Sequence, residues 1–282
     1  MVENRPFLTF LTHLVLIAGV VIVVFPVYLA FIASTHGPGE FVSGLVPLLP
    51  GSHMIENYSM IWNEGLSSSG APPIWVMMLN SLVMAVAIAV GKIVISLLSA
   101  YAIVYFKFPL RLLAFWIIFI TLMLPVEVRI IPTFKVVADL GMLNSYQGLI
   151  LPLIASATAT FLFRQFFLTI PDELMEAARV DGAGPLKFFR DILLPLSRTN
   201  IAALFVILFI YGWVQYMWPL LVTNDSRYYT IVMGIKRLAA SADAEPLWHL
   251  VMAAVILAML PPVLVVIFMQ RLFVKGLVET EK

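Results

Sequence analysis

Six long apolar stretches, separated by segments that carry the charges, dominate the hydrophobic pattern of this chain. Apart from Lys92 in the second, they contain no Asp, Glu, Lys or Arg, and they cover residues 7–33, 75–106, 112–126, 140–163, 199–224 and 246–270. A spanning helix needs about 20 apolar residues to cross a bilayer core about 30 Å thick. The pattern therefore predicts six transmembrane helices, of which the third has the shortest apolar stretch.

Each stretch is predicted to be a helix because an open strand would leave its backbone groups unpaired in lipid. None shows the alternation of apolar and polar residues that an outer-membrane barrel strand requires. The first stretch is long for the apolar part of a cleaved signal, so we expect it to remain in the protein. The predicted fold class is an all-α integral membrane protein.

Composition supports this class and excludes others. Of the 282 residues, 62% are hydrophobic and 12% are charged, whereas a soluble domain has roughly 45–50% apolar and about 25% charged residues. Disorder requires a more polar chain. The formal net charge of +1 gives no basic surface for nucleic acid. The chain has no cysteine and only four widely separated histidines, so we expect no disulfide, no thiolate chemistry and no metal site.

The distribution of Lys and Arg predicts the orientation, because cytoplasmic loops are enriched in both. With both termini in the cytoplasm, eleven of these residues lie inside and five outside, and Lys92 lies within a span. The organisation predicted is a first helix with an outer segment (residues 1–76), a five-helix core (77–270) and a cytoplasmic tail (271–282). The outer segments 34–74, 127–147 and 224–249 are too short to be domains.

Small residues recur at helical spacing in the second stretch. Ser81, Ala85 and Ala89 are four residues apart, and so are Ser96 and Ala100. Such stripes allow transmembrane helices to approach closely. They predict a tightly packed bundle, or helices that move against each other around a pathway, and the stripes alone do not separate these two interpretations.

The inner loop between the fourth and fifth stretches predicts two short helices with a sharp bend. Thr169 is the expected N-cap of the first, with Pro171 in the first turn and Asp172 at the capping-box position. Gly182 and Gly184 are expected to end it.

The second short helix is predicted to begin at Pro185 and to stop near Pro195. Its pattern predicts one apolar face, formed by Leu186, Phe189, Ile192 and Leu193. A helix pair of this kind lies flat in the lipid headgroups or inserts into a groove of a protein partner. The balance of acidic and basic residues favours the protein groove.

This loop resembles the EAA loop of ABC importer permeases. The resemblance rests on Glu-Ala-Ala at 176–178, Asp-Gly-Ala at 181–183, Phe188, and the Leu-Pro pair at 194–195. The segment 213–220, Trp-x-Gln-Tyr-x-Trp-Pro-Leu, resembles a signature of the carbohydrate-type permeases related to the maltose importer. That family usually has Asn where this chain has Gln215.

The resemblance implies a type I ABC importer fold, in which the EAA loop (170–195) forms coupling helices seated in a cytoplasmic ATPase subunit. The residues implied at this joint are Glu176, Ala177, Ala178, Asp181, Gly182, Ala183, Leu186 and Phe189. Glu176 and Asp181 would be charged contacts, Gly182 the tight bend, and Leu186 and Phe189 part of the buried face. The implied partners are a second permease subunit, two copies of the ATPase and a solute-binding protein, at the bacterial inner membrane.

The chain lacks the phosphate-binding pattern G-x-x-x-x-G-K-[ST]. We therefore expect it not to be an enzyme and to hold no cofactor of its own. ATP and Mg²⁺ would bind to the partner ATPase.

Two further stretches, 121–129 and 156–167, resemble the branch of the family that imports sn-glycerol-3-phosphate, and a sugar or oligosaccharide is the alternative cargo. Candidate residues of the substrate path are Lys92, Arg129, Trp213, Gln215 and Trp218. Lys92 could pair with a carboxylate or reach the interface, contact substrate, or support a subunit interface. Arg129 could pair with Glu127 or attract an anionic substrate.

Two other classes of membrane protein fit less well. An ion-driven transporter usually has an acidic residue within a span, and none of the apolar stretches contains one. An intramembrane enzyme would need a nucleophile with its base or a paired-acid arrangement, and the stretches show neither.

Overall fold

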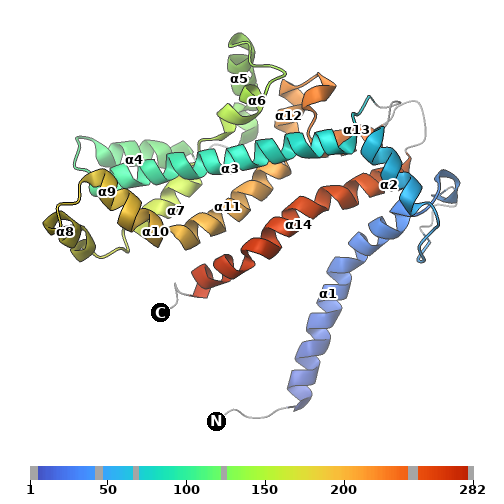
Figure 1. The fold of residues 1–282 in the computed structure, drawn as a ribbon, viewed down its shortest axis with the longest axis horizontal. Helices are drawn as coiled ribbons and strands as arrows, with labels where there is room; N and C mark the ends of the chain where they lie inside the picture. The colour runs from blue at the N-terminus through green and yellow to red at the C-terminus, as the bar shows by residue number, and fades with distance from the viewer. Residues whose placement is uncertain (1–5, 42–46, 66–69, 122–125, 241–246, 279–282) are drawn as a thin grey trace. The chain divides into compact units, whose positions relative to one another are not determined.

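The computed structural model describes residues 6–41, 47–65, 70–121, 126–240 and 247–278. These residues form helices and no strand, which confirms the all-α prediction (Figure 1). The α-helices are α1 (Pro6–Ser34), α2 (Met54–Asn63), α3 (Ile74–Tyr105), α4 (Arg111–Ile120), α5 (Val126–Asp139), α6 (Tyr146–Ile150), α7 (Ala157–Phe167), α8 (Asp172–Val180), α9 (Pro185–Phe188), α10 (Leu194–Leu196), α11 (Arg198–Trp213), α12 (Met217–Val222), α13 (Ile231–Ala239) and α14 (Trp248–Val278). Short 3₁₀ turns are η1 (Pro38–Phe41), η4 (Leu151–Leu153) and η6 (Ser226–Tyr228), and η5 (Phe189–Leu193) is a π-helical turn.

Three described helices, α1, α3 and α14, are long and apolar enough to cross a membrane. Each corresponds to one predicted span, and α14 continues through Pro261 and Pro262. Two more spans result if bent helix pairs are counted as one: residues 146–153 with α7, bent by 46°, and 185–196 with α11, bent by 70°. The first of these breaks lies within the fourth predicted span, and the second lies just before the fifth, which is itself interrupted between α11 and α12.

The third predicted span, 112–126, does not form one described helix. In its place, α4 has 10 residues, which corresponds to about 15 Å of helix and is about half of a bilayer core. Residues 122–125 lie outside the described residues, and α5 begins at Val126 with Pro132 inside it. The six-span count is therefore not reproduced as predicted.

The chain divides into two compact units. The first contains Met1–Val76 and Gly234–Leu260, and the second contains Met77–Met233 and Pro261–Lys282. Residues 234–260, which the sequence assigns to the core, thus pack with the N-terminal unit.

Within the first unit, a polar network closes the end of α1. The Asn57 side chain of α2 donates hydrogen bonds to the carbonyls of Ser34 (2.9 Å) and His36 (2.8 Å). The Gly51 N–H donates to the Thr35 hydroxyl at 2.7 Å. Ser34, Thr35 and Asn57 are buried, and the two Asn57 bonds satisfy the Ser34 carbonyl, which the helix end leaves open, and the His36 carbonyl just beyond it.

His36 connects two parts of this network with both ring nitrogens. Nε2 lies 2.9 Å from the Leu49 carbonyl, and Nδ1 contacts the Glu40 carboxylate. A carbonyl and an ionised carboxylate can only accept hydrogen bonds, so both ring nitrogens donate when Glu40 is charged. Burial alone would lower the pKa of His36, but the bonds to Glu40 and Leu49 and the charge of Glu40 outweigh it and raise the pKa above 6.5.

The integrity of the described residues 35–41 and 47–57 is expected to depend on pH. Because the folded pKa of His36 is raised, its contribution is complete below pH 6.5 and is lost as pH rises through that raised pKa. The pKa of Glu40 is lowered below 4.5, chiefly by the His36 bond, so its contribution is complete above pH 4.5 and is lost only in stronger acid. His53 Nδ1 lies 3.8 Å from Glu40 on its other side.

Hydrogen–deuterium exchange of this segment, corrected for intrinsic rates, measures the effect between pH 5.5 and 9. Protection should decrease across that range in the native chain and stay flat in His36→Gln. Equal pH profiles for the two proteins would contradict the prediction.

In the second unit, the small-residue stripe of α3 makes close helix contacts, as the sequence predicts. The Ser81 hydroxyl accepts a hydrogen bond from the Ile231 N–H at 2.8 Å. A Cβ added to Gly212 of α11 would lie 2.8 Å from the Cα of Ala85. Further along, Ser96 donates to the Ser156 carbonyl (3.2 Å). The stripe therefore faces α11, α13 and the start of α7.

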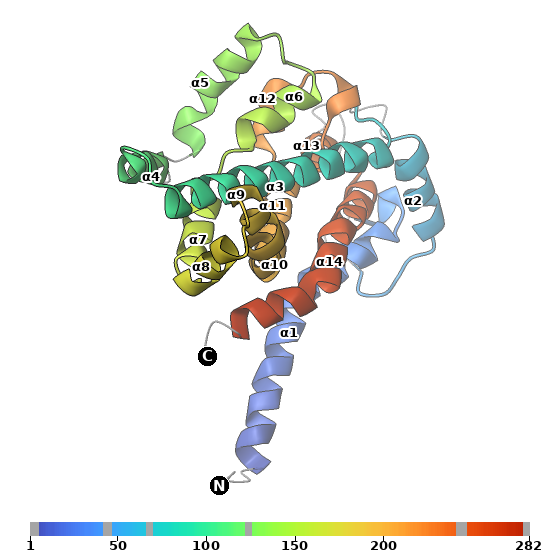
Figure 2. The same cartoon turned by 60° about the vertical axis from the view of Figure 1, so that its left-hand side comes forward.

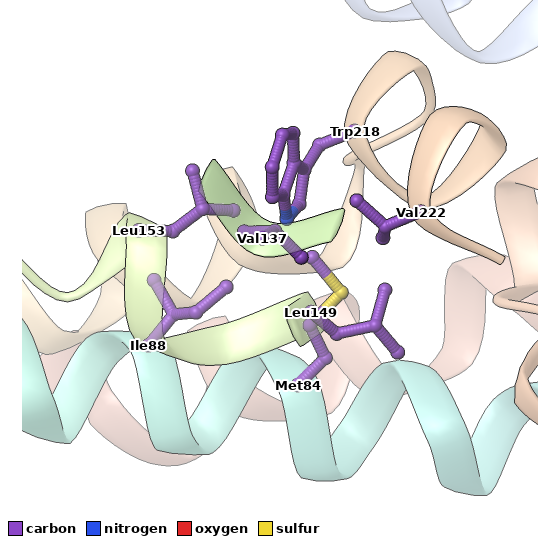
Figure 3. Close-up of a cluster of buried hydrophobic side chains, with 7 residues drawn as sticks. All are labelled: Met84, Ile88, Val137, Leu149, Leu153, Trp218 and Val222. Atoms are coloured by element: carbon purple, nitrogen blue, oxygen red, sulfur yellow. The ribbon is translucent and has the colours of Figure 1, made fainter. Parts of the chain in front are cut away.

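A cluster of buried apolar side chains fixes α3 to the segments on its other side. Its members are Met84, Ile88, Val137, Leu149, Leu153, Trp218 and Val222. Figure 3 shows Met84 and Ile88 of α3 beneath Leu149 and Leu153, with Trp218 and Val222 of α12 above. The Trp218 indole N–H donates to the Gly148 carbonyl at 3.1 Å, so α6 and α12 are held together over α3.

Candidate functional site

The first helix of the predicted pair, α8, ends in a complete Schellman motif. Gly182 has φ +71°, its N–H donates to the Arg179 carbonyl (3.0 Å), and the Ala183 N–H donates to the Ala178 carbonyl (2.8 Å). A left-handed residue is required at this place, which explains the glycine. The predicted bend at Gly182 is confirmed.

The start of α8 differs from the prediction. Pro171 is the N-cap and provides no side-chain cap. The Thr169 hydroxyl donates to the Phe166 carbonyl at 2.7 Å, so it closes the end of α7. The fixed φ of Pro171 pre-organises the entry into the helix, and Asp172 and Glu173 in the first turn favour its dipole.

The second helix of the pair is continuous from Pro185 to Leu196 and contains the π turn η5. Pro195 cannot donate to the Asp191 carbonyl and would crowd it in an α-helix, and a π turn relieves such a conflict. The wider turn places residues five apart on one face, so Phe188 and Leu193 are the buried pair. Of the predicted apolar face, Leu186 is 78% exposed in this chain.

Aromatic contacts fix this helix to the C-terminal end of α3. The Tyr101 hydroxyl donates to the Pro185 carbonyl at 2.9 Å. The ring of Tyr101 lies 5.0 Å from Phe189, and that of Tyr105 lies 5.3 Å from Phe188, between centroids. Figures 1 and 2 show α8 and α9 beside that end of α3. A displacement of the helix pair would therefore be transmitted to a long apolar helix.

The residues implied at the joint mostly point outward. Glu176, Ala177, Asp181 and Gly182 are exposed, Ala183 and Phe189 are half-buried, and Ala178 is buried against its own chain. Two large apolar side chains flank the bend in full exposure, Val180 at 88% and Leu186 at 78%. An exposed apolar surface between acidic residues is typical of a protein contact.

A second candidate site is a cavity of about 550 Å³ that α5, α11 and α12 line together with η4. Arg129 contributes the charge, and Gln215, Tyr211 and Tyr216 contribute polar groups. Of the predicted path residues, the cavity brings together Arg129, Gln215 and Trp218. Trp218 is also part of the core described above.

Lys92, near the middle of α3, is 7% exposed. Its ammonium lies 3.8 Å from the ring centroid of Tyr211, which lines the cavity. A desolvated cation–π contact contributes about 2 kcal/mol, whereas a charge at the centre of a spanning helix costs at least about 2.5–3.5 kcal/mol. The tyrosine ring alone therefore does not offset the cost of this cation.

No ion pair among the described residues includes Lys92 or Arg129. The prediction that Arg129 pairs with Glu127 depends on a side chain outside the described residues. Trp213 lies away from the cavity lining: it is 3% exposed and stacks on Phe209. Its position is that of a core residue of α11.

Two residues with evident roles were not singled out from the sequence. Tyr211 lies four residues before Gln215, whose amide donates to the Tyr211 carbonyl at 3.1 Å, and this i,i+4 spacing could have identified it. Asn80 is buried and donates to the carbonyls of Arg227 (2.8 Å) and Tyr229 (2.9 Å). It therefore holds the start of the predicted outer segment 224–249, whose residues 241–246 lie outside the described residues.

The family model described as "Binding-protein-dependent transport system inner membrane component" matches residues 92–279. The chain belongs to this family. The match includes the EAA-like helix pair, the cavity and the Trp-x-Gln-Tyr-x-Trp-Pro-Leu segment. The family resemblance inferred from the sequence is thus confirmed, and the chain is an inner-membrane permease component of a binding-protein-dependent transport system.

Relatives of this permease are similar over their entire length. The sn-glycerol-3-phosphate transport system permease proteins UgpE of Rhizobium meliloti (strain 1021) and Brucella melitensis biotype 1 are 61% and 60% identical over 282 residues, which is 100% of both chains. The protein of the same name in Escherichia coli O1:K1 is 58% identical over the same length.

A solved structure shows the same fold. A chain of a bacterial ABC transporter involved in the import of the acidic polysaccharide alginate aligns with a TM-score of 0.81 at 20% identity, covering 96% of this permease and 98% of that chain. This likeness confirms the fold of an ABC importer permease. At this identity, it carries no information on the cargo.

Proposed function

We propose that this chain is a permease subunit that forms half of the translocation path of an ATP-driven sn-glycerol-3-phosphate importer. The observation that carries the proposal is the full-length identity of 58–61% to permeases of that system. The cation-bearing cavity supports an anionic cargo rather than a neutral sugar, because Arg129 lines it and Lys92 lies behind its wall.

The assembly we propose contains a second permease subunit, two copies of a cytoplasmic ATPase that binds ATP and Mg²⁺, and a solute-binding protein. The chain itself performs no ATP chemistry. In this assembly both termini lie in the cytoplasm, which the excess of Lys and Arg in the inner loops supports. Residues 77–270 form the transmembrane core and 271–282 an inner tail.

Coupling runs through the EAA-like helix pair. The exposed acids Glu176 and Asp181 and the exposed Val180 and Leu186 contact the ATPase, and Gly182 holds the bend. When ATP closes the ATPase subunits, the helix pair moves with them and pulls on α3 through the Tyr101 contacts. ATP binding thus favours one of two arrangements of the spans.

The cargo is tested with the purified complex in proteoliposomes, loaded with its binding protein. ATP-dependent uptake of labelled sn-glycerol-3-phosphate should exceed that of maltose under the same conditions. A preference for maltose would overturn the organophosphate assignment and leave the family membership intact.

Glu176→Lys is expected to leave the chain inserted and to uncouple ATP hydrolysis from uptake, because it reverses an exposed charge at the proposed joint. The measurement compares uptake with ATPase rate in the same vesicles. Glu56→Lys, an exposed acid on α2, is the matched charge reversal outside the joint and should retain coupling. Normal uptake by Glu176→Lys would refute the assigned contact.

A further inference from the structure

One cation lines the cavity between α5, α11 and α12, and a second lies against Tyr211, a residue of the cavity wall. Lys92 comes from α3 and is 7% exposed, while Arg129 comes from α5 and lines the cavity. The Lys92 ammonium lies 3.8 Å from the ring centroid of Tyr211, and Tyr211 and Arg129 line the same cavity. Within the described part of the chain, neither cation is part of an ion pair.

Like charges that share a poorly hydrated region repel each other, and the repulsion is stronger where the dielectric is low. Ionised residues within a membrane normally pair with one another or mark a substrate or ion path. A ligand with two negative charges would remove this repulsion. The two nearby cations are therefore unfavourable in the empty protein but favour the binding of such a ligand.

The shapes of the two cations suit a phosphate monoester. Such a group carries about −1.5 to −2 charges at pH 7 and three acceptor oxygens. Arginine presents a planar fork for two of these oxygens, and lysine acts as a compact point charge. The Tyr211 ring, 3.8 Å from the Lys92 ammonium, holds this charge at the cavity wall.

We propose that Lys92 and Arg129 together bind the phosphate group of the cargo during its passage. This inference rests on the proposed function and deepens it, since it assigns substrate recognition to this subunit. Gln215 and Tyr216 line the same cavity and offer polar groups to the hydroxyls of the glycerol part.

The test uses Lys92→Met and Arg129→Met in the complete complex with its partner permease, ATPase and binding protein. Initial uptake of labelled sn-glycerol-3-phosphate should fall on the order of tenfold or more in each variant, as the loss of a hydrogen bond to a charged group implies. Removal of a buried charge that has no counter-ion among the described side chains relieves a desolvation cost, so Lys92→Met should assemble at least as well as the native chain.

Lys135→Gln is the matched control. Lys135 is another cation of α5, but its side chain is 75% exposed and pairs with Asp139 at 2.9 Å. Its replacement should leave uptake unchanged. Arg129→Cys gives a second readout, because this chain has no other cysteine: an aminoethyl thiosulfonate reagent should restore part of the uptake, and a sulfonatoethyl reagent should not.

The outcomes distinguish a failure of the phosphate site from a failure of the proposed importer function. Uptake by Lys92→Met at the native rate overturns the phosphate site and leaves the importer assignment standing. Loss of the assembled complex in Lys92→Met also overturns it, because it would show that the ammonium has an acidic partner such as Glu127. If the native complex imports no sn-glycerol-3-phosphate, the proposed function itself fails.

Discussion

Gly182→Val is expected to reduce ATP-driven uptake by about tenfold or more while leaving the chain in the membrane. Gly182 has φ +71°, and a left-handed conformation costs L-residues roughly 1–2 kcal/mol, most of all β-branched ones. Apart from the adjacent residues, no atom of the described chain lies within 4 Å of an added Cβ, so the effect arises from the backbone alone. The turn between α8 and α9 would lose its geometry, and the contact with the ATPase would transmit less of the coupling energy.

Gly184→Val is the matched control, because Gly184 lies in the same turn with an ordinary φ of −71° and open space around it. Asn tolerates the left-handed region, so Gly182→Asn should retain most of the uptake. The measurement is uptake per molecule of ATP hydrolysed. Equal losses in Gly182→Val and Gly184→Val would mean that side-chain bulk, and not the bend, is responsible.

Gly212→Val is expected to prevent stable packing of α11 on α3. A Cβ at this position would lie 2.8 Å from the Cα and 3.3 Å from the Cβ of Ala85. Because the obstacle is backbone, the two helices would have to separate. Overpacking of this kind typically costs about 1–3 kcal/mol or more, and separation would also disturb the Lys92–Tyr211 contact.

The thermal midpoint of the detergent-solubilised chain and its yield from the membrane measure this effect, and both should fall. Gly19→Val supplies the control: Gly19 also lies within a helix, α1, and has no atom within 4 Å of an added Cβ. It should behave like the native chain. A native-like midpoint for Gly212→Val would exclude the close α3–α11 approach.

The sequence predicted the geometry of the coupling joint better than it predicted the cavity. The bend at Gly182 follows from neighbouring residues, since a Schellman motif needs one glycine and the carbonyls just before it. The cavity combines Arg129 of α5 with Tyr211 and Gln215 of α11 and its end. No local pattern connects those segments, so the sequence could name the cations but not place them together.

The sequence by itself determined that this protein is a helical membrane permease. Long runs without charge are sufficient for the helical membrane fold, because the bilayer allows few structures, and the permease assignment came from the resemblance of the inner loop to the EAA loop. Only the tertiary structure showed that the third apolar run is not one described helix, that Phe188 and not Leu186 faces inward, and that Lys92 lies over Tyr211. These features depend on contacts between distant segments, where packing overrides local periodicity.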